Sequence, residues 1–140
     1  MIAMTPRRKI DFDAGMDALR TWREQGDDTP RRQQMTAVRF CLEELEQRHP
    51  GRAVEVRVPP AGAVQILKGT THRRGTPPAV VEMSMPTWLR LATGDLSWDE
   101  GDAAGLIQAS GQRTDLAALL PLFDGQDLAV HSQSADAGGL

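Results

Sequence analysis

The sequence predicts an α+β domain in which helices cover one side of a mostly antiparallel sheet. Three features of its 140 residues support this fold class. Apolar residues first recur with a helical period, the period changes to two near Val54, and short strands then alternate with short helices. One domain with its own core is expected, because a chain of about 150 residues buries roughly 68–70% of its unfolded surface.

The first helix is expected to start at Asp11, whose carboxylate is placed to cap it. Its apolar residues, Phe12, Met16, Leu19 and Trp22, fall on one helical face. A Gly-Asp-Asp sequence then ends the helix, because glycine and aspartate favour turns.

A second amphipathic helix is expected to begin with Thr29 as its N-cap and Pro30 in its first turn, where the missing N–H is not needed. The sequence His-Pro-Gly from His49 onward ends this helix. Its apolar face is formed by Met35, Val38, Leu42 and Leu45.

Strands are expected next. Val54, Val56 and Val58 alternate with charged residues, which predicts a strand with one solvated face. Pro60 and Gly62 occupy positions favoured in a type I turn, so the following strand is expected to be a hairpin partner. The remaining candidate strands are residues 63–68, 79–83, 106–110 and, at the edge, 128–130.

Three short helices are expected among the later strands. Residues 86–93 read as a helix, and Gly94 follows where a left-handed cap is favoured. Ser97 and Glu100 match the reciprocal positions of a capping box, which starts the next helix. Thr114 is expected to cap a last helix, which carries Leu116, Leu119 and Leu120.

Composition limits the domain organisation and the class of protein. We expect a mobile basic arm at residues 1–10, one domain at residues 11–123 and a disordered tail at residues 124–140. A net charge of -3 argues against a nucleic-acid partner. No apolar run reaches the ~20 residues of a membrane span or forms a signal peptide, so a cytoplasmic protein with at most peripheral membrane contact is expected.

The search for chemistry predicts a protein that is not an enzyme and has no cofactor and no metal site. Cys41 is the only cysteine, and beside an apolar helix face it is expected to be a packed hydrophobe. The three histidines are isolated from one another. The glycine-rich loop at residues 69–76 lacks the lysine of a phosphate loop, but Arg73 and Arg74 are candidates for contact with an anionic head group.

Several segments together resemble one known family, the sterol carrier proteins, and most closely the short bacterial members of actinobacterial type. The resemblance covers roughly residues 35–122. Its segments are Ala-Val-Arg-Phe from Ala37, Leu-Glu-Glu-Leu from Leu42, the strand from Val54 to Pro60, Gly-Ala-Val-Gln from Gly62, Arg-Gly-Thr-Pro-Pro from Arg74, the helix from Trp88 to Gly94, Leu-Ser-Trp from Leu96, Ala-Gly-Leu-Ile from Ala104, and Ser110-Gly111.

The resemblance implies a sheet of about five strands with an apolar tunnel between the sheet and the C-terminal helices. It also implies non-enzymatic binding, and transfer, of a lipid such as a fatty acid, an acyl-CoA or a polycyclic lipid. A homodimer is compatible with the sequence. The apolar residues expected to line the tunnel are Val64, Ile66, Met83, Trp88, Leu89, Leu91, Leu96, Trp98, Leu106, Leu116, Leu119 and Leu120.

Two alternatives stay open. The same side chains would equally fill a closed core, because a packed core and a ligand cavity are lined by the same residue types. The chain would then be a structural or protein-interaction module. A thiol-linked isomerase is the third interpretation, and it is disfavoured because no histidine cluster and no helical metal-binding domain precede the match.

Overall fold

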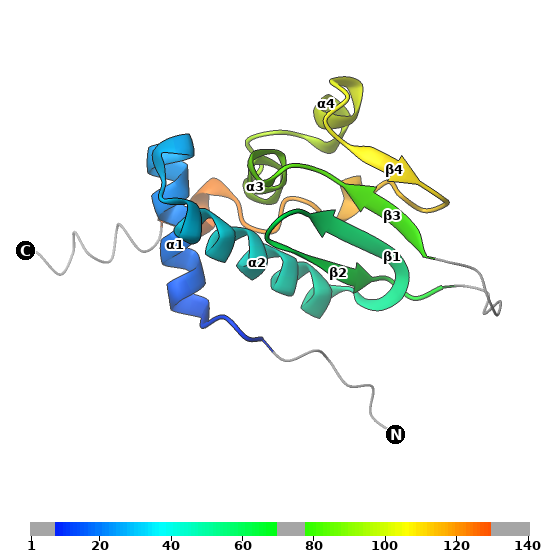
Figure 1. The fold of residues 1–140 in the computed structure, drawn as a ribbon, viewed down its shortest axis with the longest axis horizontal. Coiled ribbons are helices and arrows are strands. Elements are labelled where there is room, and N and C mark those ends of the chain that lie inside the picture. The colour runs from blue at the N-terminus through cyan, green and yellow to red at the C-terminus, as the bar shows by residue number, and fades with distance from the viewer. Residues whose placement is uncertain (1–7, 70–77, 130–140) are drawn as a thin grey trace, which may run out of the picture.

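The computed structural model describes residues 8–69 and 78–129, which form one layer of helices on one face of a sheet (Figure 1). The elements, in chain order, are α1 (Phe12–Gln25), the 3-10 turn η1 (Gly26–Asp28), α2 (Arg31–Arg48), β1 (Pro50–Val58), β2 (Gly62–Ile66), β3 (Ala79–Glu82), α3 (Met85–Thr93), α4 (Trp98–Ala103), β4 (Gln108–Ser110) and the 3-10 turn η2 (Ala117–Leu119).

Within residues 8–69 and 78–129 the sheet has four strands in the order β2-β1-β3-β4, and it is mixed. β1 pairs antiparallel with β2, and β3 with β4, but β1 and β3 are parallel. The expectation of about five mostly antiparallel strands was therefore wrong in number and in one pairing. The hairpin returns the chain to the end where β1 begins, and β3 starts from that end on the other side of β1, so both strands run in the same direction.

The alternating valines of β1 place the core on the helix side of the sheet. Val54, Val56 and Val58 are fully buried, whereas Glu55 and Arg57 form an ion pair on the opposite face. The predicted hairpin is confirmed, with Val56 opposite Val64 and Val58 opposite Gly62. Its turn differs: Ala61 N–H donates to the Val58 carbonyl at 2.9 Å, so the two prolines occupy its centre and the bond between them is cis.

Most helix signals are confirmed. The Asp11 carboxylate accepts from the Ala14 N–H at 3.1 Å, Gly94 adopts φ 82°, and the capping box of Ser97 and Glu100 is complete. Thr29 is the exception, because α2 starts one residue late and its N-cap, Pro30, has no capping side chain. A residue before proline is disfavoured in the helical region, and Thr29 is accordingly extended, with ψ 133°.

The last predicted helix does not form. Only Ala117–Leu119 make a 3-10 turn, and Leu116 and Leu120 flank it. Pro121 explains this, because it has no N–H to donate to the carbonyl four residues earlier and disfavours a helical Leu120. Residues 125–129 are helical instead of forming the edge strand considered for residues 128–130.

Both ends of the described chain are more firmly held than the sequence suggested. At the end of the expected arm, the Lys9 and Ile10 N–H groups each donate to the Glu43 carboxylate at 3.0 Å. At the start of the expected tail, Asp124 and Asp127 cap each other's N–H groups, and Leu128 is 4% exposed. Residues 8–10 and 124–129 therefore belong to the folded unit.

A close approach of α1 to α2 depends on Gly15. A Cβ built on Gly15 would lie 2.2 Å from Cδ1 of Phe40, a fully buried ring.

Gly15→Ala is expected to lower the free energy of unfolding by at least about 1 kcal/mol, because overpacking outweighs the better helix propensity of alanine. Chemical denaturation measures this. Gly125→Ala is the control, since its Cβ would lie 3.5 Å from the flexible Arg23 guanidinium; equal effects of the two substitutions would contradict the packing argument.

Candidate functional site

The predicted apolar wall is largely one buried layer between the sheet and α3. Eight of its twelve residues belong to the continuous core cluster at 0–8% exposure: Ile66, Met83, Trp88, Leu89, Leu91, Leu96, Trp98 and Leu116. Trp88 ties α3 to α2, since its indole N–H donates to the Val38 carbonyl at 3.3 Å. Leu119, Leu120 and Val64 are only partly buried and pack against this cluster. Leu106 is 38% exposed and lies outside the layer.

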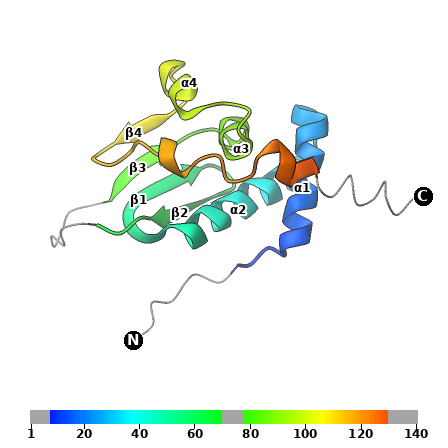
Figure 2. The same cartoon turned by 180° about the vertical axis from the view of Figure 1, so that it is seen from behind.

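A C-terminal cover, residues 111–129, closes this layer. Figure 2 shows it in orange, passing from β4 across α3 to α1. It contributes four side chains that are 0–4% exposed: Leu116, Leu122, Phe123 and Leu128. Its hydrogen bonds to the rest of the fold are few for its length. Leu122 and Phe123 N–H both donate to the Ala92 carbonyl, at 2.9 and 3.0 Å, and the Leu128 carbonyl accepts from Arg20 Nε at 2.9 Å. At the start of the cover, Arg113 Nη1 donates to the Lys68 carbonyl at 2.6 Å.

An aromatic cluster fixes the cover to both N-terminal helices. The Phe40 and Phe123 rings are stacked, with centroids 5.5 Å apart and planes 9° apart. Phe12 meets Phe40 edge to face at 5.6 Å. The Arg8 guanidinium lies 5.3 Å from the Phe40 centroid, and that of Arg48 lies 5.4 Å from the Phe123 centroid. Cation–π attraction thus adds to the stacking.

Glu44 joins the two arginines of this cluster. Its carboxylate pairs with Arg8 through one oxygen and with Arg48 Nε at 2.7 Å through the other. Burial alone would raise the pKa of Glu44, but the hydrogen bonds from the two arginines outweigh burial and hold the pKa below its ordinary value. The ion pair therefore stabilises the fold while Glu44 is ionised.

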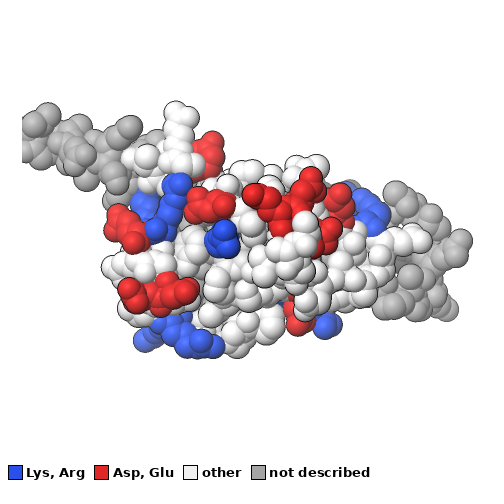
Figure 3. Space-filling view, turned by 90° about the horizontal axis from the view of Figure 1, so that it is seen from above, with Lys and Arg blue, Asp and Glu red and all other residues white. Residues whose placement is uncertain are grey.

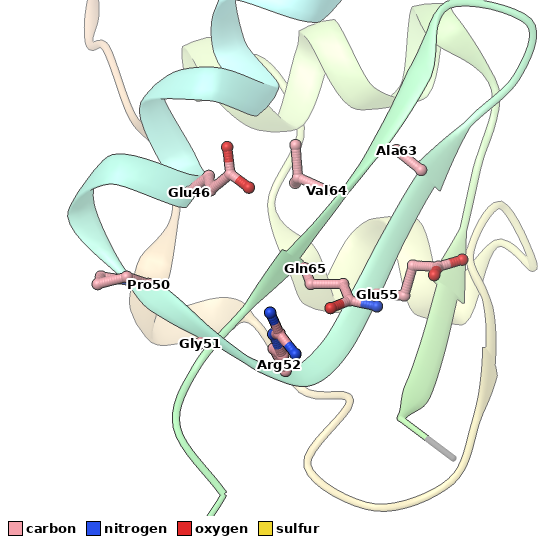
Figure 4. Close-up of a pocket in the computed structure, with 8 residues that line it drawn as sticks. All are labelled: Glu46, Pro50, Gly51, Arg52, Glu55, Ala63, Val64 and Gln65. Atoms are coloured by element: carbon pink, nitrogen blue, oxygen red, sulfur yellow. The ribbon is translucent and has the colours of Figure 1, made fainter. Parts of the chain in front are cut away.

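Two surface depressions lie between α2 and β2, away from the apolar layer. One, of about 580 Å³, is lined by Glu46, Pro50, Gly51, Arg52, Glu55, Ala63, Val64 and Gln65 (Figure 4). The other, of about 700 Å³, is lined by Lys9, Ile10, Thr36, Arg39, Leu42, Glu43, Glu46, Gly62, Ala63 and Val64.

These depressions share Glu46, Ala63 and Val64, and Figure 4 shows the Glu46 carboxylate reaching toward Val64. We call the pair the α2–β2 groove. Val64 is the one predicted wall residue that lines it. The groove could not be predicted from the sequence, because its polar residues come from separate elements and form no sequence motif.

The polar candidates from the sequence do not form a reaction centre within the described residues. Arg73 and Arg74 lie outside these residues. Cys41 is fully buried, and burial, followed by the nearby Glu44 charge, raises its pKa. Residues 8–69 and 78–129 contain no group of three or more His, Cys, Asp or Glu side chains that could hold a metal ion.

Charged side chains of both signs lie on the surface of the described part of the chain. On the face shown in Figure 3, acidic and basic side chains are interspersed, with no continuous basic surface of the kind that binds nucleic acid. None of the helices in the described part of the chain is long and apolar enough to span a bilayer.

Replacing Glu44 should reveal the contribution of the ion pair to stability. Glu44→Gln is expected to lower the free energy of unfolding by about 1–3 kcal/mol at pH 7, because two arginines lose a charged acceptor. The folded-state pKa of Glu44 is lowered, so its contribution is complete above the unfolded-state pKa and disappears as pH falls through the folded-state pKa. Urea denaturation between pH 7 and pH 3 should show the two proteins converging in acid. Exposed Glu24→Gln is the control, and a pH-independent difference would contradict the assignment.

Cys41 should report on opening of the core. Because burial raises the pKa of this thiol, a disulfide reagent at pH 8 is expected to react with the native protein only as fast as the fold opens. The absorbance of the released thiolate measures the rate, with the denatured protein as the reference for full reactivity. Native labelling as fast as in denaturant would contradict the burial of Cys41.

Comparison with known proteins assigns the family. A model of the family described as bacterial SCP ortholog matches residues 30–122, more than half of the chain. No curated protein matches the chain. The matched range runs from the start of α2 to Leu122 in the cover, so it includes the whole sheet, α3 and α4. The chain therefore belongs to the bacterial SCP ortholog family, a sterol carrier protein-like family.

Proposed function

We propose that this protein is a non-enzymatic lipid-binding protein that holds a fatty acid, an acyl-CoA or a polycyclic lipid between the sheet, α3 and the C-terminal cover. Membership of a sterol carrier protein-like family supports lipid binding and transfer at the level of the family. Apolar burial is sufficient for such a function, so no catalytic group is required.

The observation that carries this proposal is the construction of the cover. The cover buries Leu116, Leu122, Phe123 and Leu128, yet between residues 111 and 124 its only regular element is the turn Ala117–Leu119. Most of its backbone is therefore not committed to helix or sheet bonds. Displacing the cover breaks few hydrogen bonds and leaves the sheet and α3 intact. A ligand would therefore enter the apolar layer by displacing the cover.

The free energies of apolar burial allow a ligand to replace the side chains of the cover. Exposing four large apolar side chains costs about 6–12 kcal/mol at about 1.5–3 kcal/mol each. A lipid chain with about twelve methylenes buried in their place gains about 10 kcal/mol, at about 0.8 kcal/mol per methylene. The two terms are of similar size, so a lipid chain can replace the cover's side chains without a preformed empty tunnel. Arg73 and Arg74 are the cations we propose for the head group.

A second candidate function is a structural or protein-interaction module. The complete burial of eight of the predicted wall residues favours it, because these side chains already fill the layer. The two functions differ in one measurable respect. Lipid binding requires an apolar ligand to displace the cover, whereas an interaction module does not.

Loosening the cover should speed lipid uptake. Phe123→Ala is expected to raise the association rate of a fluorescent fatty acid at least tenfold. The substitution removes the stack on Phe40, and a loss of about 1.4 kcal/mol in the free energy that favours the closed cover corresponds to a factor of ten. Stopped-flow fluorescence measures the rate. Phe12→Ala is the graded comparison, since Phe12 is 46% exposed and meets Phe123 only edge to face at 6.4 Å, so a smaller increase in the association rate is expected.

The equilibrium experiment is native mass spectrometry of protein purified without detergent, followed by organic extraction of any adduct. A bound lipid would support the proposal and identify the ligand class. Bare protein that also fails to bind added acyl chains of graded length would contradict lipid binding. Unchanged uptake in Phe123→Ala would contradict the cover as the entrance while leaving lipid binding intact.

A further inference from the structure

We propose that residues 2–6 of this chain pair antiparallel with the outer edge of β2, where they close the α2–β2 groove. These residues lie outside the described part of the chain. Three features of the described part point to them: the outward backbone groups of β2, the apolar floor of the groove, and the place where the chain enters the groove. The contact is separate from the C-terminal cover and does not depend on lipid binding.

The backbone of β2 presents hydrogen-bonding groups outward at Ala63 and Gln65. Met83 N–H donates to the Arg57 carbonyl at 3.1 Å, so Arg57 faces β3 and not β2. Its partner in β2, Ala63, therefore turns its N–H and C=O away from the sheet, and so does Gln65, two residues later. Among the described residues β2 is the last strand on this side of the sheet, so these four groups have no strand to pair with.

The groove beside this edge has an apolar floor. Val64 points from β2 toward α2 (Figure 4) and is partly buried. The Leu42 side chain lies beside Gly62, since a Cβ built on Gly62 would lie 3.9 Å from Leu42 Cδ1, and Leu42 is 2% exposed. A strand paired with β2 would therefore direct alternate side chains onto this apolar surface and the others toward solvent.

The described chain starts at this groove. Lys9 and Ile10 line it together with the first three residues of β2. Their N–H groups both donate to the Glu43 carboxylate at 3.0 Å, which fixes this point of the chain to α2. Figure 1 shows that the dark-blue segment before α1 runs opposite to the β2 arrow, which is the direction that an antiparallel pair requires. The three residues from Lys9 back to Pro6 span about 10 Å at about 3.3 Å per residue, so the chain can cross from α2 to the edge of β2.

The proline in this segment limits the register. Pro6 has no N–H, so it fits an edge strand only at a position that faces away from β2. Thr5 and Ala3 then supply the N–H and C=O groups that face β2. In the register that we propose, Thr5 pairs with Ala63 and Ala3 pairs with Gln65, so that each pair exchanges two hydrogen bonds.

The same register directs the apolar side chains of the segment into the groove. Met4 lies opposite Val64, and Ile2 lies opposite Ile66. Directly opposed residues share one face of a sheet, so both apolar side chains point toward α2. The missing N–H of the proline and the alternation of apolar residues therefore favour the same set of outward and inward positions.

A register shifted by two residues fits less well. It would place Arg7 opposite Ala63, whose partner in β1 is Arg57, so two positive side chains would flank a small alanine on one face. It would also carry Ile2 past Ile66, the last residue of β2, so that the Ile2 side chain would miss the floor of the groove.

Covalent attachment favours this segment over a separate peptide. Only two residues, Arg7 and Arg8, connect the segment to the point that is fixed on α2. Arg8 is itself held by its ion pair with Glu44 and by the Phe40 ring, 5.3 Å from the guanidinium. A short tether gives an effective concentration on the order of millimolar, so the segment can occupy the edge with an affinity that would leave a free peptide unbound.

Amide exchange measured by NMR tests the contact in the full chain. The N–H groups of Ala63 and Gln65 are expected to exchange slowly in the wild type, because the segment accepts their hydrogen bonds. Met4→Asp, which places a carboxylate on the apolar floor, is expected to speed both exchange rates at least about tenfold. Thr5→Asp is the matched control, since the same carboxylate then faces the other side of the sheet and the rates stay near those of the wild type. The N–H of Val64 faces β1, so its exchange is expected to be equal in all three proteins.

A disulfide tests the register. Opposed residues of a hydrogen-bonded pair have Cα atoms about 5.5 Å apart, a separation that accepts a disulfide. Thr5→Cys combined with Ala63→Cys is expected to form an intramolecular disulfide under mild oxidation. Met4→Cys combined with Ala63→Cys is not, because the two side chains lie on opposite faces. The native Cys41 is buried and does not interfere.

Three outcomes overturn the proposal. The first is fast exchange of the Ala63 and Gln65 N–H groups in the wild type, which would mean that nothing pairs with this edge. The second is slow exchange that Met4→Asp leaves unchanged, which would mean that another group protects the edge. The third is a disulfide that forms only between two molecules, which would make the occupant a second copy of the chain.

Discussion

Packing around Phe40 holds the helical layer together. This fully buried ring on α2 contacts three segments that are distant in the sequence: α1 reaches it because Gly15 has no side chain, the cover stacks Phe123 on it, and Arg8 lies over it. Phe40 lies within the residues that match the family, whereas Gly15, Phe123 and Arg8 lie outside them. The segments just before and just after the matched range therefore meet on one side chain within it.

The same packing explains why the apolar layer is closed. The cover has little regular structure of its own, so its position depends on a few contacts: two N–H groups on the Ala92 carbonyl, the Phe40–Phe123 stack and the burial of its leucines. The aromatic stack and the leucine contacts are side-chain interactions, and in the proposed function a ligand chain replaces them, because apolar burial has no directional requirement. In the proposed function, the side chains of the cover and the ligand compete for the same apolar surface.

The sheet divides the molecule into surfaces with different chemistry. Its helix-facing side is apolar and enclosed, and its other side carries charged residues such as Glu55 and Arg57. The edge at β2 is bounded by α2, Arg39 and the start of β1, which produces the α2–β2 groove. The edge at β4 is open along its exposed residues.

Several local features of the fold follow from the sequence alone. Helical period, the Asp11 cap, the capping box at Ser97 and the cap at Gly94 depend on residues within one or two turns, and the valine alternation of β1 depends on its two faces. Eight of the twelve apolar residues predicted to line the tunnel are buried together in one core cluster. A pattern of neighbours is enough to specify features of this kind.

Only the tertiary structure decided how these elements combine. Pairing of β3 with the far side of β1 depends on the path of the chain between them, which periodicity does not encode. Leu106 and Leu116 are the same residue type in similar apolar segments, yet Leu106 is exposed and Leu116 is fully buried in the core cluster. Whether an apolar residue fills a core or lines a cavity depends on the distant side chains that reach it, and contacts such as that of Phe123 with Phe40 exist only once the chain has folded.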